Sequence, residues 1–294
     1  MTNVSFTVSL PENYRSREVL QYYGRDKTET SEKAWKDGFK KALWVKNYPA
    51  HFVVNFDGFH AYVDANVDAR LKKATVKRVI DSVVSSVLGL SQPVAEFESM
   101  AFADCILKRM VRQTAGLRVP QSVSAWEALV GSIIGQQVSV VAATSTRSRF
   151  IKGLGVANTS GLYCFPTPKI IASCKANDLR EFGMSHAKAN TIHRVATSID
   201  LGEFSLDKDS TGHFFEKFSR QLLSYKGIGP WTVNYTLLRG YAFLDGSLHG
   251  DVVIRKKTLE LLGKSMISTE EVEQWLTQYR PWRGLLAAHL WAMS

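Results

Sequence analysis

The chain has few cysteines and no long apolar run, and both absences narrow its class. The three cysteines, Cys105, Cys164 and Cys174, form no CxxC pair and lie near no histidine at metal-ligand spacing. We therefore expect buried free thiols in a reducing compartment. No apolar run approaches the roughly 18 residues of a membrane span, and the N-terminus lacks the pattern of a signal peptide. The sequence thus predicts a cytoplasmic protein with no membrane partner.

Acidic side chains are comparatively scarce. Lys and Arg total 37 against 27 for Asp and Glu, which gives a net charge of +10. An excess of this sign suits a polyanionic partner such as nucleic acid, because cations displaced from the phosphates favour binding. Hydrophobic residues make up 45% of the 294 residues and charged residues 22%, which predicts two or three folded units rather than a disordered chain.

The first hundred residues predict a mixed α and β unit. Asp57 and Gly58 separate two β-rich runs, which indicates a hairpin with a two-residue type I′ loop, since that turn requires positive φ. Hydrophobic spacing predicts further strands at residues 5–10 and 42–45, and helices at residues 15–23 and 69–88. The second of these helices is expected to return across the sheet.

From about residue 96 onward the pattern is helical, without an internal repeat or a low-complexity linker. Ser124 and Glu127 match a capping box, in which each side chain accepts a hydrogen bond from the backbone of the other. An apolar stripe follows and is interrupted at residues 135–137. Further helices are predicted at residues 138–150, 168–176, 187–199, 213–225, 230–241, 252–262 and 269–278.

The sharpest local motif is GIGP at residues 227–230. A helix is predicted to end at Tyr225, and Pro230 suits the first position of the next helix. The amides of Gly227 and Gly229 would then face outward at the positive end of that helix, where a backbone phosphate can bind. A plain helix-turn-helix corner stabilised by glycine is the alternative at this stage.

Asp251 stands 22 positions after Gly229, immediately before an amphipathic helix. A carboxylate at this position could act in catalysis, or it could serve as an ordinary N-cap that accepts hydrogen bonds from the first turn. The spacing by itself leaves both roles open.

With these motifs the chain resembles the helix-hairpin-helix DNA glycosylase superfamily, and within it the 3-methyladenine DNA glycosylase II (AlkA) type. Besides the hairpin and the aspartate, the likeness lies in five segments that occur in the family's order: GLRVP at 116–120, GQQVS at 135–139, CFPTP at 164–168, GIGPWTVNY at 227–235, and RPWR at 280–283 with HLW at 289–291. The resemblance covers nearly the whole chain, although it is looser at the N-terminus.

The resemblance implies a mainly α fold with an N-terminal α+β domain like the antiparallel sheet of the TATA-binding protein. The implied domains are residues 1–98 for the sheet, residues 125–242 for the helical unit that carries the hairpin, and residues 99–124 with 243–294 for the unit that carries the aspartate. The implied activity is base excision repair. The enzyme would flip an alkylated purine, such as 3-methyladenine or 7-methylguanine, out of duplex DNA and hydrolyse its N-glycosidic bond.

The resemblance also assigns roles to side chains. Asp251 becomes the catalytic carboxylate, because cleavage builds positive charge on the deoxyribose that a nearby anion stabilises. The aromatic residues Trp231, Tyr235, Trp291 and, more loosely, Tyr22 become the pocket for the flipped base, where stacking and cation–π attraction select alkylated purines. Core packing is the ordinary alternative for each aromatic residue.

Other positions are implied to contact DNA, namely Lys226, Gly227, Gly229, Thr232 and the helix-tip residue Gln137. Gln137 stands where the family places a leucine that fills the gap left by the flipped base, and glutamine can also fill it. Val252 replaces an aromatic pocket residue of the family, which could narrow or shift the range of damaged bases. The carbonyls of Leu223, Tyr225 and Ile228 are implied to hold a monovalent Na⁺ or K⁺ ion.

Position 231 separates subclasses of the superfamily. Bifunctional members carry a lysine there that forms a Schiff base with the sugar, whereas this chain has Trp231. No cysteine follows Cys174, so the four-cysteine iron–sulfur loop is missing, and no cofactor is expected to be required. We therefore predict a monofunctional enzyme that acts on damaged double-stranded DNA as a nucleoid-associated monomer.

Three alternatives remain at the level of sequence. A non-enzymatic helix-hairpin-helix DNA-binding protein would need neither Asp251 nor an aromatic pocket. A bifunctional 8-oxoguanine-type glycosylase/lyase would carry lysine at position 231. An RNA-binding or tRNA-modifying protein is compatible with the basic charge alone. The sequence does not rank 3-methyladenine, 7-methylguanine, hypoxanthine and ethenoadenine as substrates.

Overall fold

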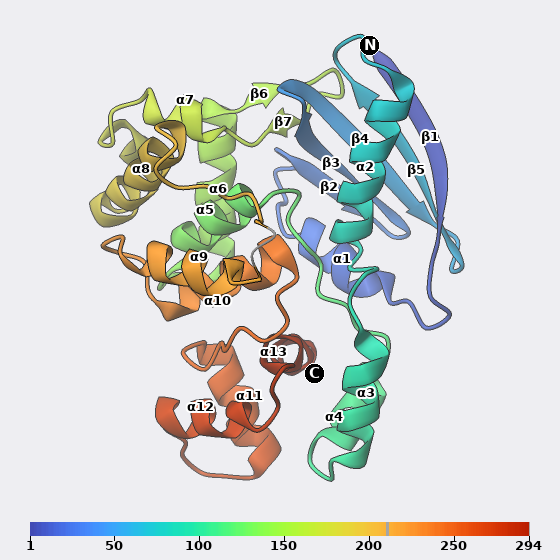
Figure 1. The fold of residues 1–294 in the computed structure, drawn as a ribbon, viewed down its shortest axis with the longest axis vertical. Coiled ribbons are helices and arrows are strands. Elements are labelled where there is room, and N and C mark those ends of the chain that lie inside the picture. Colours follow the sequence, from blue (N-terminus) through green and yellow to red (C-terminus); the bar gives the residue numbers. More distant parts are fainter. Residues whose placement is uncertain (210–211, 294) are drawn as a thin grey trace.

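The computed structural model describes residues 1–209 and 212–293. Its N-terminal part is a five-stranded antiparallel sheet with strand order β1-β5-β4-β3-β2. The helix α1 (Ser16–Tyr23) follows β1, and α2 (Lys73–Val87) crosses one face of the sheet (Figure 1). The strands are β1 (Thr2–Ser9), β2 (Glu32–Trp35), β3 (Gly38–Val45), β4 (Tyr48–Phe56) and β5 (His60–Val67). This confirms the predicted antiparallel sheet with a helix returning across it.

The hairpins of the sheet differ from the prediction in their loops. Three residues, with only Gly58 at positive φ, separate β4 from β5, so the two-residue type I′ loop predicted at Asp57 and Gly58 is wrong. The side chain of Asp57 instead accepts the amide of His60 at 2.8 Å and closes a longer loop. A two-residue loop with both residues at positive φ, as type I′ requires, joins β3 to β4 at Lys46 and Asn47.

The remainder of the described chain is mainly helical, as predicted. Two helices, α3 (Val94–Ala103) and α4 (Leu107–Gln113), lead out of the sheet, and the predicted domain boundary at residues 98 and 99 falls inside α3. A two-stranded ribbon of β6 (Val156–Ala157) and β7 (Tyr163–Cys164) contacts the sheet through β3. The other helical elements are α5 (Ala125–Gly135), α6 (Val140–Leu154), α7 (Pro168–Ala172), the 3₁₀ helix η1 (Asp178–Phe182), α8 (His186–Asp200), α9 (Phe214–Leu223), α10 (Pro230–Tyr241), α11 (Val252–Leu262), α12 (Thr269–Thr277) and α13 (Arg283–Ala292).

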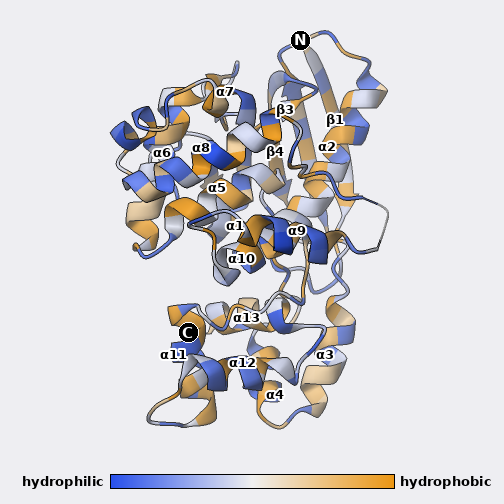
Figure 2. Ribbon diagram, turned by 60° about the vertical axis from the view of Figure 1, so that its left-hand side comes forward, coloured by the Kyte–Doolittle hydropathy of each residue, from blue (hydrophilic) through white to orange (hydrophobic). Residues whose placement is uncertain are grey.

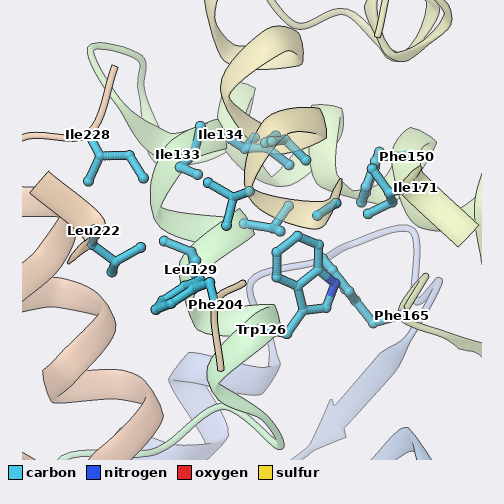
Figure 3. Close-up of a cluster of buried hydrophobic side chains, with 14 of the residues drawn as sticks. Trp126, Leu129, Ile133, Ile134, Phe150, Phe165, Ile171, Phe204, Leu222 and Ile228 are labelled. Atoms are coloured by element: carbon cyan, nitrogen blue, oxygen red, sulfur yellow. The ribbon is translucent and has the colours of Figure 1, made fainter. Parts of the chain in front are cut away.

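Three large hydrophobic clusters of described residues hold these elements together, and a small fourth one joins β3 to the β6–β7 ribbon. One lies between the sheet and α2, and a second fills the space among α5, α6, α8, α9 and α10, where Trp126, Leu129 and Ile133 project from one face of α5 (Figure 3). The third joins α3 and α4 to α11, α12 and α13, which gather at the end of the molecule away from the sheet (Figure 2). Helix α10 contributes side chains to both helical clusters and therefore lies at the boundary between them.

The predicted capping box at α5 is only half formed. Ser124 Oγ accepts the amide of Glu127 at 3.1 Å, but the Glu127 carboxylate turns away from the helix start. It accepts hydrogen bonds from Lys41 Nζ, at 2.8 Å, and from Arg147, and both cations also pair with Glu32. Lys41 is completely buried, and a buried charge is tolerated only when it is paired. This ion cluster joins β2 and β3 to α5 and α6.

The cysteines only partly follow the prediction. Cys164 is buried and donates its thiol to the carbonyl of Leu43 at 3.1 Å. Cys174 is half-buried, and Cys105 is exposed in the turn between α3 and α4, so the expectation that all three are buried is wrong. Among the described helices, none combines the length and the apolar character that crossing a membrane would require.

His289 predicts a pH dependence of stability. Its ring is fully buried in α13, Nδ1 lies 2.6 Å from Thr114 Oγ1, and burial, with a smaller contribution from Arg15, lowers its pKa to about 3. A histidine pKa below the unfolded value of about 6.5 stabilises the fold above that pH, and this stability is lost as the pH falls towards 3.

We expect the free energy of unfolding of the wild type to fall by about 2 kcal/mol more than that of His289→Gln between pH 7.5 and pH 5.0. Urea denaturation at the two pH values measures the difference. Equal losses in the two proteins would show that His289 does not carry this dependence.

Candidate active site

A cavity of about 1070 Å³ opens between the sheet unit and the two helical clusters. Its walls come from the end of α1, one face each of α5, α6 and α10, the start of α11 and the end of α13. The small residues Ala128, Gly131 and Gly135 line it from α5, so the cavity is not filled from that side. Asp251 is among the residues that line this cavity.

Asp251 fills the N-cap role that its sequence position allowed, and its carboxylate has further partners in the cavity wall. As the N-cap of α11, its Oδ1 accepts the amides of Val253 at 2.9 Å and Ile254 at 3.1 Å. The same carboxylate accepts the indole N–H of Trp231 on Oδ2 at 3.0 Å, and that of Trp291 on Oδ1 at 3.4 Å. Four N–H donors therefore hold the half-buried carboxylate in one orientation at the cavity wall.

The aromatic residues singled out from the sequence line the cavity together with this carboxylate. Trp231 and Tyr235 lie four positions apart on α10 and stack at 5.1 Å between ring centroids, with 27° between their planes. The Trp291 ring, from the end of α13, lies 6.1 Å from that of Tyr235. Tyr22 closes the cavity from α1, and its hydroxyl is 2.8 Å from Ser122 Oγ. All four rings line the same cavity.

Three arginines that line the cavity were missed in the sequence, namely Arg25, Arg147 and Arg239, and two of them contact its aromatic side chains. Arg239 is 4% exposed, and its guanidinium carbon lies 4.7 Å from the ring centroid of Tyr22, 5.4 Å from Trp291 and 5.8 Å from Tyr235. Arg25, exposed at the cavity edge, lies 5.0 Å from the Tyr22 ring. The available signal was spacing, since Arg239 follows Tyr235 by four residues on the same face of α10.

The charges of these arginines affect the pKa values of the two tyrosines in the cavity. Burial raises the pKa of Tyr22 to about 12, with a further contribution from Tyr235. Burial also acts to raise the pKa of Tyr235, but Arg239 and Arg25 outweigh it, and the pKa of Tyr235 is lowered. The end of the cavity near Arg239 is therefore electropositive.

The hairpin joins α9 to α10 at the rim of the same cavity. Its two glycines differ in backbone conformation. Gly227 has φ +96°, as its predicted turn role requires, whereas Gly229 has φ −109° and caps α10 in extended backbone. Lys226 is exposed, and its carbonyl accepts the hydroxyl of Thr191 at 2.9 Å. The Tyr225 carbonyl accepts the amide of Ile228 at 3.0 Å.

The side chain of Thr232 is buried and bonded within the protein. It is 2% exposed, and its hydroxyl accepts a hydrogen bond from Gln136 Nε2 at 2.8 Å. The Gln136 amide also donates to the carbonyl of Gly227 at 2.9 Å, so it links the tip of α5 to the hairpin. The Thr232 hydroxyl therefore links α10 to the tip of α5, and the contact of this residue with DNA stays a prediction.

The tip between α5 and α6 projects beside the cavity opening. Gln137 is exposed there at φ +54°, and Val138, Val140 and Val141 are exposed next to it. Val252, 69% exposed at the start of α11, also lines the cavity. The cavity lining at the surface thus includes exposed apolar side chains and the amide of Gln137.

The chain is similar to several known proteins. The model of the HhH-GPD superfamily of base excision DNA repair proteins matches residues 130–279. A DNA-3-methyladenine glycosylase of Bacillus subtilis is 25% identical over 294 residues, which cover 98% of this chain and 97% of the relative. DNA-3-methyladenine glycosylase 2 of Escherichia coli is 28% identical over 63% of each chain.

The fold has counterparts among solved structures. A 3-methyladenine DNA-glycosylase from Archaeoglobus fulgidus matches with a TM-score of 0.81 over 97% of this chain and 96% of that chain, at 20% identity. That likeness concerns the fold, and it includes the N-terminal sheet because nearly the whole chain is covered. Since the family model spans more than half of the 294 residues, the chain belongs to the HhH-GPD superfamily of base excision DNA repair proteins.

Proposed function

We propose that this chain is a monofunctional DNA glycosylase that removes alkylated purines from duplex DNA. The observation that carries the proposal is the Asp251 carboxylate, held by two indole N–H groups at the wall of an aromatic cavity. A carboxylate that served only as an N-cap would need no such partners. The names of the Bacillus subtilis and Escherichia coli relatives support the same substrate class.

The geometry supports separate roles for the aromatic residues, which would bind the base, and for Asp251, which would act at the sugar. A flipped purine would pack against the aromatic surface formed by Trp231, Tyr235 and Trp291, with its sugar beside Asp251. Loss of the base leaves positive charge on the deoxyribose, which the carboxylate stabilises while it orients or deprotonates water. A base that alkylation has made cationic leaves without a proton donor. The products would be the free base and an abasic site.

Residues at the rim of the cavity would bind the DNA duplex. The amides of Gly227, an exposed residue, and Gly229, a half-buried one at the start of α10, would bind one backbone phosphate. Gln137 would fill the gap left by the flipped base, with Val138 beside it. The protein would act on damaged double-stranded DNA as a monomer.

We also propose a monovalent cation at the hairpin, bound by the carbonyls of Leu223, Tyr225 and Ile228. Tyr225 already accepts the Ile228 amide, but a carbonyl oxygen has a second lone pair with which it can bind a cation. The cation would rigidify the turn and take no part in the chemistry.

The proposal is tested by incubating the protein with duplex DNA that has been methylated with dimethyl sulfate and identifying the released bases by chromatography. We expect release of methylated purines well above the spontaneous rate. Release at the spontaneous rate would contradict the proposal. If RNA treated in the same way were the better substrate, the chain would be an RNA-directed protein instead.

Reaction with damaged DNA should leave the strand intact. Since Trp231 replaces the Schiff-base lysine, we expect abasic sites but no β-elimination product, and no covalent adduct after borohydride reduction. Denaturing electrophoresis before and after alkaline cleavage measures both outcomes. A reduced adduct would overturn the monofunctional assignment, and Lys226→Gln would then show whether the exposed Lys226 had formed it.

A further inference from the structure

Two aromatic walls connect Asp251 with Arg239 across the cavity. On one wall, Trp231 bonds to the carboxylate and stacks on Tyr235, whose ring centroid lies 5.8 Å from the Arg239 guanidinium carbon. On the other wall, Trp291 bonds to the same carboxylate and lies 5.4 Å from that guanidinium carbon. Both sets of contacts therefore run from the anion at one end of the cavity to the cation at the other.

The guanidinium is held in place at this end. One of its terminal nitrogens donates to the carbonyl of Pro120 at 2.8 Å, and the side chain is almost fully buried. Within the described part of the chain, its Nε–H has no acceptor. Arg25 approaches the Tyr22 ring from the exposed edge, so a second positive charge lies near the first. The two guanidinium groups keep this end of the cavity positive.

The orientation of a flipped purine follows from the bond that is cut. The sugar is attached at N9 and must lie beside Asp251, if Asp251 is the catalytic carboxylate as proposed above. The six-membered ring then points away from Asp251, towards Arg239. Its position 6 carries a carbonyl oxygen in guanine and hypoxanthine and an amino group in adenine. The carbonyl presents negative charge to a guanidinium, whereas the amino group presents hydrogens that it repels.

We propose that Arg239, supported by Arg25, is a specificity-determining residue that favours damaged purines with a carbonyl at position 6 over those with an amino group. Methylated guanines and hypoxanthine are then preferred to methylated adenines. The lowered pKa of Tyr235 agrees with the positive potential that this selection requires. The preference rests on the proposed glycosylase activity, which it refines.

DNA methylated with dimethyl sulfate provides matched substrates in one sample. It contains 3-methylguanine with 3-methyladenine, and 7-methylguanine with 7-methyladenine, and each pair shares its methyl position and its charge. Single-turnover release of each base is divided by its spontaneous release, because the four bases differ in intrinsic lability. Within each pair, the enhancement for the guanine is divided by that for the adenine. This ratio measures the effect of the six-membered ring, in which the two bases differ.

We expect this ratio to exceed one in the wild type and to fall about tenfold in both pairs in Arg239→Met. Arg239→Lys keeps the charge and should retain part of the ratio. Arg25→Met changes an exposed side chain and should lower the ratio about threefold, so it decides the question if Arg239→Met fails to fold. Circular dichroism confirms the fold of each variant.

An unchanged ratio in a folded Arg239→Met, or in Arg25→Met when the first variant does not fold, overturns the proposal. A wild-type ratio at or below one also overturns it. These results leave the glycosylase itself in place when base release still depends on Asp251. If no methylated base is released, or Asp251→Asn releases bases at the wild-type rate, the proposed function itself has failed.

Discussion

Asp251→Asn is expected to slow single-turnover base excision by about 10²–10⁴-fold, because the charged transition state loses its anion. The substituted side chain keeps a carbonyl oxygen that can accept the amides of Val253 and Ile254, so α11 stays capped and the fold is retained. Binding to duplex DNA, which the rim residues provide, should persist. Excision under single-turnover conditions and duplex affinity are the two measurements.

Asp104→Asn is a matched control. Asp104 accepts the amides of Ile106 and Leu107, both at 2.8 Å, just as Asp251 caps α11, but it does not line the cavity. We expect this variant to excise bases at the wild-type rate. An Asp251→Asn protein that folds and excises within threefold of the wild type would remove Asp251 from the chemistry. Loss of folding in Asp251→Asn alone would favour a purely structural cap.

Gly229→Ala is expected to weaken binding to damaged and undamaged duplexes alike, by about tenfold, because a β-carbon blocks the approach of a phosphate to the start of α10. The protein itself leaves room for this atom, since a Cβ at position 229 meets nothing within 4 Å and φ is −109°. The melting temperature should therefore stay unchanged, and selectivity between lesions should change little.

Gly227→Ala distinguishes the effect of backbone strain on stability from the effect of a lost phosphate contact on affinity. At Gly227 the φ of +96° disfavours any side chain, and a Cβ would collide with the hydroxyl of Thr191. This variant should lose thermal stability as well as affinity, whereas Gly229→Ala should lose affinity only. Duplex titration and thermal melting of both variants provide the comparison. Unchanged affinity in Gly229→Ala would mean that the turn is a structural corner.

Much of the fold could be predicted from the sequence because the signals are local. Helical spacing places Trp231 and Tyr235 on one face of α10, and Pro230 marks its first turn, so the bounds of that helix were predicted to the residue. The superfamily was recognised from short segments in order along the chain, and the family match confirms it. The loop at Asp57 was predicted wrongly because Asp–Gly suits several turns, and strand register decides among them.

The tertiary structure decided what each polar side chain does. Glu127 has the sequence context of a capping box, yet its carboxylate neutralises Lys41, a residue 86 positions away that folding buries beside it. Asp251 had two competing roles in the sequence, and it fills the N-cap while bonding to indoles from α10 and α13. Arg239 lay on a predicted helix face, but only the packing of α1 and α13 around it made it part of the cavity. Local pattern determines the elements of this protein, whereas the partners of buried charges are set by contacts between distant segments, which periodicity does not encode.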